Sequence, residues 1–135
     1  MKVWEIFQKK VAQLINLSYL CRMKREVIAF GDYYDDFMAT LNEAERKKVR
    51  YILDLLETEE RVSTKFVEYI RDGLFEIRIE YNSNIYRIFF IFDKGKIVVL
   101  FNGFQKKTQK TPESEIQKAL RIKKEYYEYK QNQKH

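Results

Sequence analysis

The sequence is poor in the side chains that carry most metal and redox chemistry. It contains one cysteine, Cys21, and one histidine, His135, which is the last residue. A single cysteine excludes a disulfide bond within the chain and is typical of a reducing cytoplasm. These two residues cannot form a metal site without several carboxylates, and no carboxylates cluster at ligand spacing. We therefore expect no metal and no organic cofactor, and any catalysis must proceed without imidazole.

Glycine and proline are also scarce, with four and one among 135 residues, whereas 45% of the residues are hydrophobic. This composition argues against disorder and against a loop-rich β-sandwich. The chain has no Gly/Ser linker and no internal repeat. We therefore expect a single domain, over residues 23–135.

The first 22 residues lack the long apolar run of a signal peptide or a membrane span. The longest run between Val3 and Leu20 is two residues, and the apolar positions instead recur near one face of a helix. We interpret residues 1–22 as an amphipathic N-terminal extension that docks on the domain or on a partner. An alternative stays open, in which translation begins at Met23 and the extension is optional or a misplaced start.

The charge of the chain is unevenly distributed. The net charge is +6, and residues 73–135 alone carry 13 basic and 7 acidic side chains. A basic excess of this kind suits a polyanionic partner, and it also suits a lysine-rich solubilising surface. Charge alone does not separate the two.

The pattern of apolar and turn residues predicts an α+β protein with the order β-α-α-β-β-β-α. The expected strands span 25–30, 74–81, 85–92 and 96–103, and the expected helices span 33–41, the segment after Asn42, and about 111–130. Asn42 and Glu45 form a predicted capping box, and Thr111 and Pro112 mark the start of the last helix. Alternating apolar and charged residues in 74–81 predict an antiparallel sheet with the helices packed on one face.

Basic residues in the predicted strands suggest where chemistry occurs. Arg78 and Arg87 lie on neighbouring strands, so cross-strand pairing brings them together on one face. Such a group binds phosphates through charge-assisted hydrogen bonds. Glu76 is a candidate base for removing a proton from a ribose 2′-hydroxyl, and crowded lysines can have depressed pKa values. The alternative readings are that Glu76 neutralises an arginine and that the lysines are solvated.

Four motifs, taken together, resemble a known family. They are Gly-Leu-Phe-Glu-Ile-Arg at 73–78, Tyr-Arg-Ile-Phe at 86–89, Phe-x-Lys-Lys at 104–107 and Lys-Thr-Pro-x-x-Glu-Ile-x-x-Ala at 110–119. Their order and spacing are similar to the HigB-like branch of the RelE/ParE toxin superfamily, over about residues 25–127.

The resemblance implies the compact microbial RNase fold and the toxin of a type II toxin–antitoxin pair. Its activity would be ribosome-dependent cleavage of mRNA in the A site, which stops translation. A helix-turn-helix, HigA-like antitoxin would neutralise it, and operator DNA would be bound only indirectly through that antitoxin. The protein would be cytoplasmic, with no role at a membrane.

The resemblance also implies roles for residues at matching positions. Arg78 and Arg87 would clamp the phosphate, and Lys106, Lys107 and Lys110 would bind the backbone and take part in proton transfer. Together with the candidate base Glu76, the predicted catalytic set is Arg78, Arg87, Lys107 and Glu76, and the predicted RNA-binding set is Lys106, Lys107, Lys110, Phe104 and Arg121. Cleavage would be metal-independent, through attack of the 2′-hydroxyl to give a 2′,3′-cyclic phosphate. We predict on this basis that Arg87→Ala abolishes growth arrest in a protein that stays folded. Two alternatives remain: a toxin of the same fold that acts on a protein such as DNA gyrase, and a non-catalytic RNA-binding relative.

Overall fold

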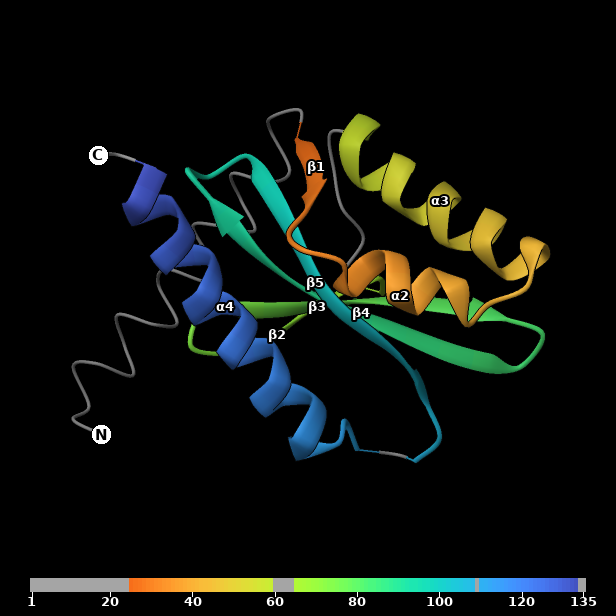
Figure 1. Cartoon of the computed structure of the whole chain (residues 1–135). Coiled ribbons are helices and arrows are strands. Elements are labelled where there is room, and N and C mark those ends of the chain that lie inside the picture. The colour runs from red at the N-terminus through yellow and green to blue at the C-terminus, as the bar shows by residue number, and fades with distance from the viewer. Residues whose placement is uncertain (1–24, 60–64, 109, 134–135) are drawn as a thin grey trace.

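The computed structural model describes residues 25–59, 65–108 and 110–133 (Figure 1). Its elements are β1 (Glu26–Ala29), α2 (Tyr33–Ala39), α3 (Glu43–Thr58), β2 (Val67–Arg71), β3 (Leu74–Tyr81), β4 (Asn84–Asp93), β5 (Ile97–Lys106) and α4 (Glu113–Gln133). The predicted extension at 1–22 lies outside the described residues. No described helix has the length and apolar character needed to cross a membrane.

The five strands form one mixed sheet in the order β1-β5-β4-β3-β2. β2 through β5 are antiparallel neighbours, whereas β1 runs parallel to β5. The predicted α+β class is confirmed. Two details differ: 67–71 forms an additional strand, and β1 makes the sheet mixed because it joins the distant β5 rather than a hairpin neighbour.

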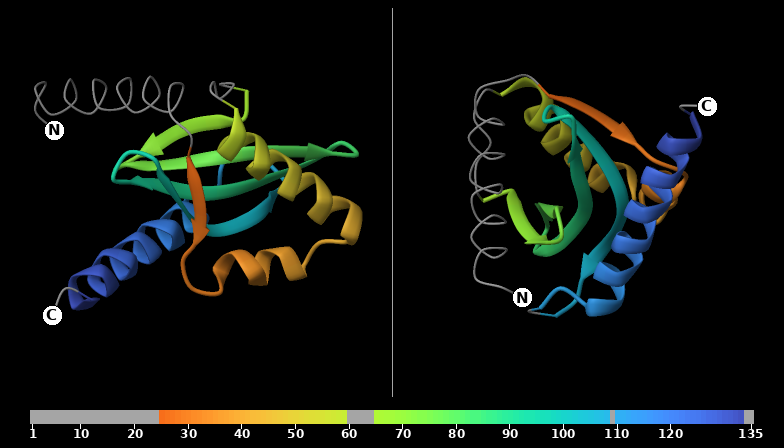
Figure 2. Two further views of the ribbon diagram at one scale, coloured as in Figure 1. Left: turned by 90° about the horizontal axis from the view of Figure 1, so that it is seen from above. Right: turned by 90° about the vertical axis from the view of Figure 1, so that its left-hand side faces the viewer.

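The helices cover both faces of the sheet, not one (Figure 2). On β5, Val98 and Leu100 belong to the core under α2 and α3, whereas Val99 and Phe101 belong to the core under α4. The expectation of one covered face came from β3, whose second face is mostly charged. The second faces of β4 and β5 carry large apolar residues, and burying these requires another helix.

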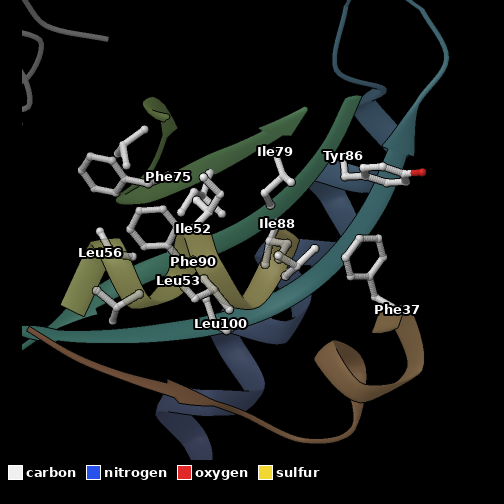
Figure 3. Packing of buried hydrophobic residues seen from close by; sticks show 14 of the residues in the cluster. Phe37, Ile52, Leu53, Leu56, Phe75, Ile79, Tyr86, Ile88, Phe90 and Leu100 are labelled. Atoms are coloured by element: carbon white, nitrogen blue, oxygen red, sulfur yellow. The ribbon is translucent and has the colours of Figure 1, made fainter. Parts of the chain in front are cut away.

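The core under α2 and α3 depends on the sequence pattern of α3. Its buried residues are Val49, Ile52, Leu53 and Leu56, which follow the predicted helical spacing. In Figure 3 the side chains from α3 meet aromatic and branched residues of β3 to β5. The predicted capping box is confirmed, since Asn42 Oδ1 accepts a hydrogen bond from Glu45 N at 2.9 Å and Glu45 Oε1 accepts one from Asn42 N at 2.8 Å.

The N-cap of α4 lies one residue after the expected position, Thr111, and the helix begins at Glu113. The backbone N–H groups of Glu115 and Ile116 both donate to the carbonyl of Pro112, so Pro112 occupies the cap position. The buried side of the helix consists of Ile116, Ala119, Ile122 and Tyr126. The apolar pattern of the sequence predicts Tyr127 on this side, but Tyr127 is 39% exposed. Thr111 is thereby left to make a different contact, described below.

Candidate nucleic-acid interface

The second face of the sheet is the one that α4 covers in part. One end of this face carries charged residues in place of apolar core residues. Here β2, β3 and β4 contribute Glu68, Glu76, Arg78 and Arg87, which we call the charged cluster. Arg78 and Arg87 are directly opposite in the β3–β4 register, and Glu76 is opposite Glu68 in the β2–β3 register. Directly opposite residues point to the same side of a sheet. The predicted pairing of the two arginines is therefore found in the structure.

Arg87 and Glu76 form a buried ion pair at the centre of the cluster. Arg87 Nη1 donates to Glu76 Oε1, and only 6% and 2% of the two side chains are exposed. Glu68 Oε2 lies 3.9 Å from the same Nη1, and Thr111 Oγ1 donates to Glu76 Oε2 at 3.3 Å. Glu76 thus neutralises Arg87, which is one of the two readings left open by the sequence. The Nε of Arg87 is buried without a partner.

The environment of Glu76 perturbs its proton affinity. Burial raises the pKa of the Glu76 carboxyl above its usual value, although the positive charge of Arg87 opposes that rise. On β5, Lys106 is opposite Ile85, which is two residues from Arg87 on β4, so Lys106 lies on the same side of the sheet as the cluster. Its charge also lowers the pKa of Glu76. A carboxylate with a raised pKa is suited to accept and release a proton near neutral pH.

Arg78 is the accessible member of the arginine pair. Its side chain is 38% exposed and is ion-paired with Glu80. Arg78 and Arg87 both line a hollow of about 190 Å³, whose walls also include Lys65, Phe66 and Glu68. Guanidinium groups bind phosphate oxygens in a bidentate fashion and keep their charge at all relevant pH values. The hollow therefore has the chemistry of a phosphate site.

The remaining predicted residues do not all gather at the charged cluster. Phe104 lies opposite Arg87 on β5, but its ring is stacked on Phe89 with centroids 5.5 Å apart. Phe104 is therefore partly committed to core packing. Lys110 is exposed in the connection from β5 to α4, where its carbonyl accepts a hydrogen bond from Thr108 Oγ1 at 2.9 Å.

Lys107 and Arg121 lie around a different groove. Lys107 lines a hollow of about 400 Å³ between α2 and α4, together with Tyr33 and Lys118. Arg121 lies close enough to Tyr33 for its charge to lower the pKa of the Tyr33 hydroxyl. A hydrogen bond with Glu125 raises the same pKa more strongly. Successive residues of an extended chain point to opposite sides, and this separates Lys107 from Lys106.

Several residues of the site were missed by the sequence analysis. Glu68 and Phe66 lie on and before β2, a strand that was not assigned. Thr111 was assigned to a helix cap. The run of β-branched and aromatic residues at 66–70, interrupted only by Glu68, was the available signal for β2. Among the described residues, no group of His, Cys, Asp and Glu is arranged to hold a metal ion.

Comparison with known proteins adds a family and a distant structural likeness. The family model described as phage derived protein Gp49-like (DUF891) matches residues 36–124. A chain of the archaeal RelE–RelB complex from Pyrococcus horikoshii OT3 is similar at 19% identity, with 60% of this chain and 93% of that chain covered and a TM-score of 0.44. No curated protein matches the chain.

Proposed function

The chain belongs to the Gp49-like family of phage-derived proteins, a family of RelE/HigB-type toxins, and we propose that it cleaves mRNA on the ribosome as the toxin of a type II toxin–antitoxin pair. The observation that carries the proposal is the direct opposition of Arg78 and Arg87 over a hollow, with the buried Glu76 beside them. Together these residues provide a phosphate clamp and a base of raised pKa without any histidine.

The proposed reaction begins when a phosphodiester enters the hollow. Arg78 binds the non-bridging oxygens first, since it is the accessible arginine. The phosphate then draws the guanidinium of Arg87 towards itself and away from Glu76. This movement supplies the second charge of the clamp and uncovers the Glu76 carboxylate, so one event assembles both groups.

The chemical step moves two protons. Glu76 accepts the proton of the ribose 2′-hydroxyl while the 2′-oxygen forms a bond to phosphorus, and both arginines stabilise the extra negative charge on the phosphorane. The bond from phosphorus to the 5′-oxygen breaks, and a lysine ammonium gives its proton to that oxygen. Lys106 fits this role better than Lys107, because Lys106 faces Glu76 whereas Lys107 lines the other groove. The products are a 2′,3′-cyclic phosphate and a 5′-hydroxyl, and exchange with water restores both side chains.

The proposal includes the partners expected of such a toxin. The net charge of +6 suits the ribosomal A site, where the surroundings are RNA. A helix-turn-helix antitoxin of the HigA kind would neutralise the toxin, and contact with operator DNA would be made by that antitoxin. The site of action would be the cytoplasm.

Incubation of the purified protein with ribosomes carrying a defined mRNA tests the proposal. We expect cuts within the A-site codon, with 2′,3′-cyclic phosphate ends. An Arg78→Ala variant should cut about 10²–10³-fold more slowly, with a stability change of less than about 1 kcal/mol. The matched control is Arg50→Ala, which removes an exposed, ion-paired arginine of α3 that lies outside the cluster. Gyrase inhibition without mRNA cuts would refute the proposal in favour of a protein target. RNA binding without cuts would identify a non-catalytic relative.

A further inference from the structure

The hollow beside the two arginines continues around the edge of β3 towards α3. β2 begins at Val67 and pairs with β3 only as far as Ile77, and the last contact is the hydrogen bond from Arg78 N to the carbonyl of Phe66 at 2.7 Å. Beyond this point the edge of β3 adjoins a second hollow of about 440 Å³. The two hollows share Lys65, Phe66 and Arg78 as lining residues, so they adjoin, and we call the two together the groove.

The walls of the second hollow are cationic and aromatic. Lys48 and Ile52 of α3 form one side, and Phe66 and Arg78 form the other. Phe66 is half-buried, so one part of its ring packs on the core while the rest faces the groove. One carboxylate, Glu80, lines this hollow, and it is ion-paired with Arg78.

A second aromatic residue lies next to Lys48 on α3. Tyr51 is 54% exposed, and the Lys48 ammonium lies 5.5 Å from the centre of its ring. Cations alternating with aromatic faces along a groove are the arrangement that holds single-stranded nucleic acid, through phosphate contacts and base stacking.

We propose that this groove binds the single-stranded RNA next to the scissile phosphate, with Phe66 stacking on a base and Lys48 contacting a phosphate. The inference rests on the proposed function and extends the substrate site from the sheet face to α3. Lys48 and Phe66 are RNA-positioning residues in this account, and neither takes part in proton transfer. The groove makes RNA a better occupant than an acidic peptide, because a peptide would not require an aromatic face between the cations.

A binding titration with single-stranded RNA tests the inference. The probe is a fluorescent oligonucleotide with 2′-O-methyl riboses, which cannot undergo 2′-hydroxyl attack, and binding by the full chain is followed by anisotropy at several salt concentrations. Lys48→Ala should reduce the slope of log K against log salt by about 0.7, the amount expected for one phosphate contact to a single strand. Lys47→Ala is the matched control, since Lys47 is exposed on the same helix and does not line the groove.

Two substitutions of Phe66 separate stacking from packing. Phe66→Leu keeps apolar bulk and removes the ring, and we expect about tenfold weaker binding. Phe66→Tyr keeps the ring and should bind within about twofold of the unmodified protein, and thermal unfolding checks that both variants are folded. On ribosomes, both Lys48→Ala and Phe66→Leu should lower the rate at limiting mRNA while the cut ends keep their cyclic phosphate.

Three results would overturn the inference while leaving the proposed function intact. The first is an equal change in the salt slope of RNA binding for Lys48→Ala and Lys47→Ala, and the second is unchanged RNA affinity of Phe66→Leu. The third is that Lys48→Ala or Phe66→Leu loses antitoxin binding while RNA binding is unchanged. The last result would identify the groove as a protein-docking site. Absence of both RNA binding and ribosomal cuts in the unmodified protein would instead refute the proposed function itself.

Discussion

Removal of Arg87 should destabilise the protein far more than a surface substitution does. Arg87→Ala leaves the Glu76 side chain, which is 2% exposed, without the one ion-pair partner that it has among the described residues. Breaking a buried pair by removing one partner costs about 3–5 kcal/mol, against a total stability of about 5–15 kcal/mol for a domain. The sequence-based expectation of a folded Arg87→Ala variant is therefore revised, and loss of toxicity in that variant would not identify a catalytic residue.

A double-mutant cycle measures the pair directly. We expect Glu76→Gln in the Arg87→Ala background to recover about 2 kcal/mol or more of the free energy of unfolding, because the buried charge is gone. Urea unfolding of the four proteins, followed by circular dichroism at pH 7, provides the values. Additive effects of the two substitutions would refute the reasoning, since they would show that the residues do not interact.

The same variant should have a distinctive dependence on pH. Burial raises the pKa of Glu76 in the folded protein, and loss of the opposing charge of Arg87 raises it further. A carboxyl whose folded pKa is above its unfolded value binds protons more tightly in the folded state, so its contribution to stability is present at low pH and is lost as pH rises through the folded pKa. The destabilisation caused by Arg87→Ala should therefore be smaller at pH 5 than at pH 8. An equal loss at both values would contradict the assignment.

Further substitutions test the site and the packing. Arg78→Ala should change stability by less than about 1 kcal/mol, because the ion pair of Arg78 is exposed. The substitution should lower the ribosomal cleavage rate by about 10²–10³-fold in single-turnover measurements. A rate within threefold of the unmodified protein would exclude Arg78 from the clamp. Gly103→Ala would place a Cβ 2.6 Å from the ring of Phe37, so we expect thermal unfolding to report a loss of about 1–3 kcal/mol, and no loss would show that α2 shifts freely. Asn42→Ala removes the cap of α3 and should cost about 0.5–2 kcal/mol in urea unfolding, with Asn42→Asp as a control that keeps the cap.

Local chemistry predicted that the two arginines lie on neighbouring strands, but not that they lie directly opposite. The expected strands 74–81 and 85–92 leave a three-residue connection, which would place Arg78 opposite Ile88. In the structure, Asn82 and Ser83 have φ values of 49° and 66° and form a two-residue turn between Tyr81 and Asn84. Such a turn fixes the register of the whole hairpin, and counting back from it places Arg78 opposite Arg87. The capping box and the buried stripe of α3 were predictable, since both depend on residues at most one turn apart.

Local alternation separates Lys106 from Lys107, but which of the two faces Glu76 was not predictable from the sequence. Lys106 and Lys107 are neighbours in the chain, yet one faces Glu76 and the other lines the groove beside Tyr33. Which side each faces depends on where β5 stops following the register of β4 and where α4 docks. These are long-range contacts, and no local pattern encodes them.

The sequence by itself determined the α+β class, the turns, the family resemblance and the strand pair that holds the arginines. Only the tertiary structure decided that α4 covers the apolar end of the second sheet face, that β2 closes the charged end, and that Glu76 is buried against Arg87. The physical reason is that turns, caps and alternation result from interactions between near neighbours. The burial of a charge depends on which distant surfaces remain to be covered once those elements have formed.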